Sequence, residues 1–186
     1  MQPVEIITRL LADEVLSPSQ VQPPSSPGFY AWWCRRDRLE DANPQIPLEE
    51  RPPVPSGWSL LYVGISPSRP NSRRNIALRL AKDHTRGRIG SSTFRQSVAA
   101  LLMGHLALQP REGSDRSRLV SEQPLSRWIE TSCGVTLAPA ERPWESEADI
   151  IRLLNPPLNI SKGTHPFREE VRACRAMLRQ ACGVAE

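Results

Sequence analysis

The hydrophobic and polar positions along the chain recur with two different periods, and each period predicts one kind of element. Two apolar runs rich in aromatic and branched residues, Gly28–Cys34 and Ser59–Ile65, are typical of β-strands, and a shorter run at Val135–Ala138 predicts a third. The segment Arg35–Gly57 is charged and rich in proline, so we expect a long surface loop there. The first two strands are expected to pair in antiparallel fashion across this loop.

Apolar residues at helical spacing predict the remaining elements, which alternate with polar loops at 17–27 and 107–122. In chain order, we expect helices at 4–15, Asn75–Lys82, Thr93–Leu106 with Ser91 or Ser92 as N-cap, Pro124–Thr131, Pro143–Leu154, and Pro166 through about Ala181. The predicted fold class is therefore α/β, with a small central, mostly antiparallel sheet of about three strands and flanking helices.

Length and composition fit one ordinary domain. A chain of 186 residues can bury a core without disulfide or metal staples. We expect a core at about 28–160, with an N-terminal helix, an insertion at 35–57 and a C-terminal helix at 166–182 added to it. The first residues lack the apolar run of a signal peptide, no segment is apolar enough to span a bilayer, and the cysteines form no C-x-x-C pair. These features predict a cytoplasmic protein with reduced thiols and no membrane partner.

Positive charge is concentrated in one segment. The chain as a whole has a net charge of +4, but Arg69–Arg95 contains eight basic residues and a single acid, Asp83. A preference for arginine over lysine explains the residue type but not the clustering, so we expect a surface that binds a polyanion, most simply nucleic acid. The candidate phosphate contacts in this segment are Arg73, Arg74, Arg86, Arg88 and Arg95.

The two tyrosines of the chain, Tyr30 and Tyr62, each lie inside a predicted strand. If these strands are neighbours, both hydroxyls can converge on one patch. A tyrosine is a poor base at neutral pH unless a nearby cation lowers its pKa from about 10. The alternative interpretation is that both are half-buried strand aromatics with hydroxyls at the surface.

Five short elements occur in one order along the chain. They are Gly28-Phe29-Tyr30, then Tyr62-Val63-Gly64, then Arg79 on a predicted helix, then Glu147 three and four residues before Ile150 and Ile151, and finally Asn159 in the run N-P-P-L-N. Either tripeptide alone is uninformative, but the ordered set resembles the GIY-YIG endonuclease superfamily. The resemblance extends from Gly28 to about Asn159, which is most of the chain.

The resemblance implies a GIY-YIG nuclease fold and hydrolysis of phosphodiester bonds by an activated water. It implies Tyr30 as general base, assisted by Tyr62 or His84, with Arg79 stabilising the phosphate. Glu147 would hold Mg²⁺ or Mn²⁺, because a hard cation that keeps several waters can be held by one carboxylate and substrate oxygens. DNA is the expected substrate, and a homodimer or two encounters would be needed to cut both strands.

Three of these roles have an alternative. Arg79 can instead form a surface ion pair with Asp83 at i+4. His84 follows Arg79 by five residues, a rotation of about 140° in a regular helix, so it faces the site only if the helix ends near Asp83; otherwise it caps that helix. Asn159 either binds a tyrosine or stabilises the turn after Pro156. A non-catalytic nucleic-acid-binding module that uses the same basic surface is the alternative to an endonuclease.

Overall fold

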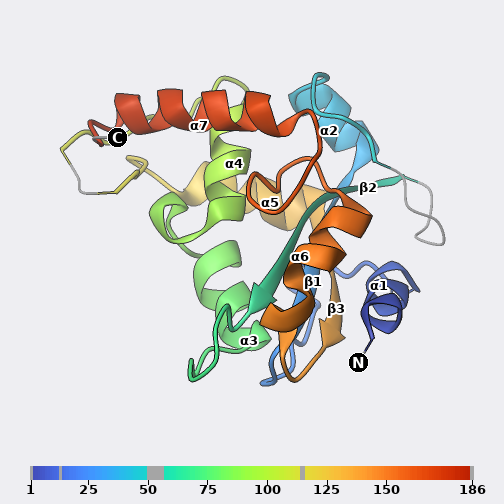
Figure 1. The fold of residues 1–186 in the computed structure, drawn as a ribbon. Helices are drawn as coiled ribbons and strands as arrows, with labels where there is room; N and C mark the ends of the chain where they lie inside the picture. Colours follow the sequence, from blue (N-terminus) through green and yellow to red (C-terminus); the bar gives the residue numbers. More distant parts are fainter. Residues whose placement is uncertain (1, 13, 50–56, 114–115, 185–186) are drawn as a thin grey trace.

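A three-stranded antiparallel sheet forms the centre of the protein (Figure 1). Its strands are β1 (Gly28–Arg35), β2 (Trp58–Ser66) and β3 (Cys133–Pro139), and within the described residues their order is β2-β1-β3. The computed structural model describes residues 2–12, 14–49, 57–113 and 116–184. The predicted α/β class and the antiparallel pairing of the first two strands are confirmed.

Helices cover both faces of this sheet (Figure 1). They are α1 (Pro3–Ala12), α2 (Arg36–Ala42), α3 (Ile76–Leu78), the π-helix η1 (Arg79–Thr85), the 3₁₀ helix η2 (Ile89–Ser91), α4 (Thr93–Leu101), α5 (Gln123–Ser132), α6 (Pro143–Leu154) and α7 (Arg168–Ala181). Helices α1 and α6 bury one apolar cluster against the sheet, whereas α3, α4, α5 and α7 contribute to a second cluster on the other face. None of the helices in the described part of the chain has the length and apolar character required to cross a bilayer.

Two predicted elements need correction. The segment Arg35–Gly57 is not a loop throughout, because α2 begins directly after β1 and buries Leu39 against the core; residues 50–56 of that segment lie outside the described residues. The helix predicted at Thr93–Leu106 ends at Leu101, and Gly104 follows in a turn. The other predicted helices occur within a few residues of their expected ends, although the one expected at Asn75–Lys82 is largely a π-helix.

The register of β1 and β2 puts both tyrosines on the same face of the sheet. Side chains alternate along a strand, so Tyr30 and Trp32 point to one face. Trp32 is paired with Tyr62 and Tyr30 with Gly64, so Tyr62 projects from the same face as Tyr30. A register shift follows between Trp32 and Trp33, beyond the tyrosine pair. The alternation of the strands therefore brings the two hydroxyls to one end of one surface.

Gly64 is required because the ring of Tyr30 lies across it. A Cβ atom at position 64 would lie 2.4 Å from the Tyr30 hydroxyl oxygen and 2.5 Å from Cζ. Gly28 has a similar constraint on the other strand, where a Cβ atom would lie 2.5 Å from the Ala138 carbonyl oxygen. Both glycines thus allow close approach in the middle of a packed sheet.

We predict that Gly64→Ala displaces the Tyr30 ring and lowers the free energy of unfolding by about 1–3 kcal/mol, the usual cost of overpacking a core. Gly104→Ala is the matched control, because nothing lies within 4 Å of a Cβ atom at that exposed position. Urea denaturation of both variants checks the prediction. Equal stability of the two variants would show that the ring does not rest on Gly64.

Candidate active site

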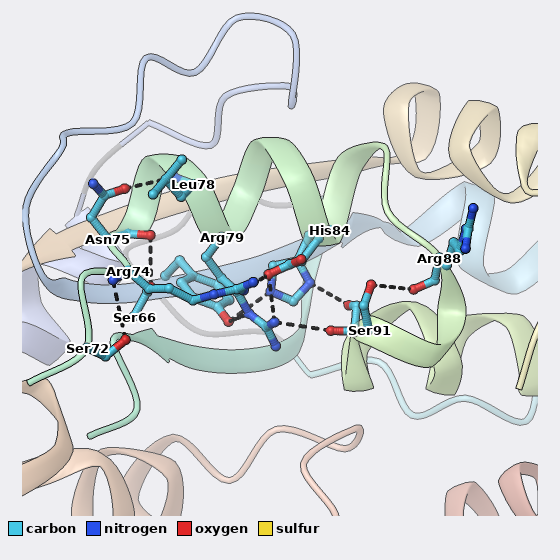
Figure 2. Close-up of polar contacts among 12 residues, drawn as sticks. Ser66, Ser72, Arg74, Asn75, Leu78, Arg79, His84, Arg88 and Ser91 are labelled. Atoms are coloured by element: carbon cyan, nitrogen blue, oxygen red, sulfur yellow. Dashed lines mark hydrogen bonds and ion pairs between the residues drawn. The ribbon is translucent and has the colours of Figure 1, made fainter. Parts of the chain in front are cut away.

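The hydroxyl of Tyr30 is the point where side chains from two elements meet. His84 Nε2 lies 2.8 Å from this oxygen, and Arg79 Nε donates a hydrogen bond to it at 3.4 Å (Figure 2). Tyr30 is buried, with 1% of its surface exposed, while the Arg79 side chain remains 20% exposed. The group therefore has a buried phenol and imidazole beside a guanidinium that reaches the surface.

A π-helical turn explains how His84 joins Arg79. The five-residue interval would place the two side chains far apart on an α-helix. Residues Arg79–Thr85 instead form a π-helix, in which hydrogen bonds join residues five apart and each turn holds an extra residue. His84 consequently lies one turn after Arg79 on the same face, although the helix does not end at Asp83.

His84 is neutral in this environment. It is fully buried, and its Nδ1 lies 2.7 Å from the hydroxyl of Ser92, the N-cap of α4. Burial lowers the His84 pKa well below its usual value, and the positive charges of Arg79 and Arg95 lower this pKa further. A neutral imidazole has one donor and one acceptor nitrogen, so it can join the Tyr30 and Ser92 hydroxyls in a single hydrogen-bonded chain.

Tyr30 keeps its proton at neutral pH, although the cation that could lower its pKa, Arg79, lies beside it. Burial is the largest effect and raises the Tyr30 pKa well above its usual value, and Tyr62 adds to the increase. The charge and the hydrogen bond of Arg79 act in the expected direction but are smaller. A role for Tyr30 as a base therefore needs a partner that takes its proton.

Arg79 is held in place by a buried carboxylate. Its Nη1 donates to Asp83 Oδ2 at 2.9 Å and to the Ser91 carbonyl at 3.2 Å (Figure 2). Arg74 forms an ion pair with the same carboxylate oxygen. The expected i+4 pair thus occurs, and it directs Arg79 towards Tyr30 rather than away from it. Among the described residues, Nη2 of Arg79 has no hydrogen-bond partner and remains available to a ligand.

Arg95 is buried, so the prediction that it contacts a phosphate on the basic surface is wrong. Its side chain is fully buried and pairs with Glu122 at 2.9 Å. Arg95 Nη1 donates to the carbonyl oxygens of His84 and Thr85, at 3.0 and 3.1 Å. A cation at these last carbonyls of the π-helix satisfies acceptors that lack a helical partner. Arg95 thereby fixes the backbone of His84.

Tyr62 has a wetter environment than Tyr30. It is partly buried, and its hydroxyl lies 3.0 Å from the hydroxyl of Thr93, an exposed residue at the start of α4. Burial raises the Tyr62 pKa, while the bond to Thr93 and the charge of Arg79 lower it. Tyr62 is therefore the more exposed of the two tyrosines, and Tyr30 is the more deeply buried.

Glu147 is an acid whose charge acts on both tyrosines. It lies on α6, its side chain is 17% exposed, and its charge contributes to the raised pKa of both tyrosines. Lys162 forms an ion pair with its carboxylate, and this partner was missed because no sequence motif includes it. The described residues contain no cluster of three or more histidine, cysteine or acidic side chains. One carboxylate near a substrate position suits an ion that keeps several waters, such as Mg²⁺.

Asn159 bonds to backbone rather than to a tyrosine. Its side chain accepts from Val63 N at 2.9 Å and donates to Val63 O at 2.8 Å. Val63 lies between Tyr62 and Gly64, so this bidentate contact holds β2 where the tyrosine pair needs it. Arg73, Arg86 and Arg88 have exposed side chains, as the predicted basic surface requires.

A model of one protein family matches residues 28–181, and that family is described as the GIY-YIG catalytic domain. The match includes the predicted C-terminal helix, α7, which lies beyond the last of the five sequence elements at Asn159. Neither the curated proteins nor the solved structures gave a significant match.

We predict that His84 makes stability depend on pH. Its pKa is about 6.5 in the unfolded chain and lower in the folded protein, so below about pH 6.5 the unfolded state binds the extra proton. Stability should be lost as pH falls from 6.5, by up to about 1.4 kcal/mol per pH unit. His84→Gln should lose less over the same range. Unfolding measurements at pH 7.5, 6.5 and 5.5 check this, and parallel curves for the two proteins would mean that His84 binds its proton equally well in the folded and unfolded states.

Proposed function

The chain belongs to the GIY-YIG family of nucleases, and on that premise we propose that it is a divalent-metal-dependent endonuclease that hydrolyses phosphodiester bonds in DNA. The observation that carries this proposal is the convergence of Arg79 and His84 on the Tyr30 hydroxyl. Such a group offers a proton relay and a cation for phosphate in one place.

The proton of the attacking water passes through Tyr30 to His84. As the water attacks phosphorus, Tyr30 Oη accepts its proton and gives its own to His84 Nε2, while Nδ1–H donates to Ser92. The raised pKa of Tyr30 and the lowered pKa of His84 leave a protonated phenol beside a neutral imidazole, which is the starting state that this relay requires. The P–O bond to the leaving oxygen then breaks, and family resemblance implies a 5′-phosphate product.

Arg79 is suited to bind the reacting phosphate. Asp83 and Ser91 orient its guanidinium, and Nη2 is left to donate to a phosphate oxygen. A planar guanidinium held in this manner binds an anion in a fixed direction, which a flexible ammonium group cannot reproduce.

Glu147 would hold Mg²⁺ or Mn²⁺, which when bound supplies positive charge to stabilise the pentacovalent phosphate. Lys162 neutralises the carboxylate in the absence of that ion. The ion and Lys162 therefore compete for the same oxygen atoms.

The function is tested by incubating the purified protein with single-stranded and duplex DNA in the presence of Mg²⁺, Mn²⁺ or EDTA. We expect cleavage with the metals and none with EDTA, and Glu147→Gln should bind DNA without cutting it. DNA binding without cleavage under every condition would favour the non-catalytic module instead.

We predict that Tyr30→Phe lowers the cleavage rate by about 10²–10⁴-fold, the contribution of general acid–base catalysis. The ring stays packed on Gly64, but His84 Nε2 loses its partner, so the free energy of unfolding should fall by about 1–3 kcal/mol. Tyr62→Phe is the matched variant, because it loses only the contact with Thr93 and should show a smaller loss. Single-turnover rates decide the matter, and a fully active Tyr30→Phe enzyme would remove Tyr30 from the mechanism.

We predict that Lys162→Gln binds Mn²⁺ more tightly than the wild type. A partly exposed ion pair contributes up to about 1 kcal/mol, so removal of the competing ammonium should raise affinity by up to about fivefold. Calorimetric titration of the free protein measures this without any cleavage assay. Glu147→Gln should abolish the binding, and unchanged affinity in Lys162→Gln would show that the ion binds elsewhere.

A further inference from the structure

Four arginines form a single row along α7. Arg168, Arg172, Arg175 and Arg179 follow one another at intervals of four, three and four residues, which places them on one face of the helix. The row is about 16 Å long at 1.5 Å per residue. We call these four residues the α7 arginine row. Helix α7 lies across one end of the molecule and packs on α4 (Figure 1).

One member of the row, Arg175, lies near the two tyrosines, because it is hydrogen-bonded to α4 beside Tyr62. Arg175 Nη2 donates to the side-chain oxygen of Gln96. Gln96 is one helical turn after Thr93, which contacts the Tyr62 hydroxyl. The charge of Arg175 also acts on Tyr62, whose pKa it lowers. Arg79 thus approaches the tyrosine pair from the side of Tyr30 and Arg175 from the side of Tyr62.

Arg175 has no carboxylate partner among the described residues. Its partner is a neutral amide, whereas Arg79 and Arg74 share Asp83. Arg175 is partly buried, and burial together with the charge of Arg179 lowers its pKa. A guanidinium in this state is stabilised by an anion, since desolvated charges require a partner.

A hollow between α7 and the segment after α6 offers room for that anion. It is lined by Ile160, Arg172, Arg175, Ala176 and Arg179 and has a volume of about 230 Å³. At roughly 30 Å³ per water molecule, this is enough for a phosphate group with part of its hydration shell. The small side chain of Ala176 leaves the space between the arginines open.

We propose that the α7 arginine row is a second phosphate-binding surface, on which Arg175 binds a backbone phosphate next to the reacting one and the nucleic-acid strand continues along α7. The proposal rests on the nuclease function given above. It adds a direction to substrate binding, because the strand then runs from Arg79, past the tyrosines, to α7. The reacting phosphate and its neighbour are then bound by two arginines, Arg79 and Arg175, that different elements supply.

The test uses DNA-binding measurements at several salt concentrations in a Glu147→Gln background, in which no cleavage occurs. Arg175→Gln should lower the slope of log K against log salt by about 0.9 on duplex DNA, or about 0.7 on single strands, which corresponds to one lost phosphate contact. The double variant Arg172→Gln/Arg179→Gln should lower it by about twice as much. Arg175→Lys should keep most of the slope.

The matched control is Arg9→Gln, which removes an equal charge from an exposed position on α1, away from α7 (Figure 1). Its slope should equal that of the Glu147→Gln parent. The inference is overturned if the α7 variants have the slope of this control, even when Arg175→Gln melts at a lower temperature, because that result indicates a purely structural role.

Cleavage by the otherwise wild-type protein separates this inference from the nuclease function. Cleavage together with unchanged slopes overturns only the α7 surface. Binding without cleavage, but with lowered slopes in the α7 variants, supports the surface and overturns the nuclease mechanism. Absence of any DNA binding by the wild type overturns both.

Discussion

The 2.8 Å contact between Tyr30 and His84 is the interaction on which the remainder of the site depends. It requires Gly64, because any larger residue would push the Tyr30 ring out of its place. The π-helical turn is equally necessary, since an α-helical turn would direct His84 elsewhere. Arg95 and Ser92 then fix the backbone and the second nitrogen of the imidazole. Features from three parts of the chain thus serve one hydrogen bond between two buried groups.

Burial of that contact decides how the group can react. A dry tyrosine beside a neutral histidine resists the formation of charge on either one, as the opposite shifts of their pKa values indicate. Concerted proton movement along the hydrogen-bonded chain avoids a phenolate on Tyr30 and leaves one positive charge, on His84. The exposed end of the group, with Tyr62 and Thr93, is free to contact a polar substrate. The protein therefore separates a dry proton path from a wet binding surface within one face of the sheet.

The sequence predicted what depends on strand periodicity and missed what depends on local backbone geometry. The facing of Tyr30 and Tyr62 follows from alternation along two paired strands, which apolar runs reveal. The position of His84 follows from a π-helix, and no residue pattern distinguishes that turn from an α-helix. Arginine is usually exposed, so the sequence favours a surface position for Arg95. Its burial is explained by Glu122, Ser126 and two carbonyl oxygens, which are distant or unmarked in the sequence. Lys162 lies shortly after the last motif, and Arg175 lies far beyond it. Their approach to the site is therefore a result of tertiary packing.

Ion pairs that already exist in the protein without substrate limit the free energy with which a phosphate or a metal ion can bind. Asp83 is already paired with both Arg79 and Arg74, and Lys162 is already paired with Glu147. A phosphate and a metal ion must exchange these internal pairs for new ones, so the net gain in binding free energy at the reaction centre is small. Arg175 has no carboxylate to give up among the described residues, because its partner is the neutral amide of Gln96, so a phosphate bound there breaks no ion pair. Affinity for the strand is therefore better supplied by Arg175 than by the residues that surround the reacting phosphate.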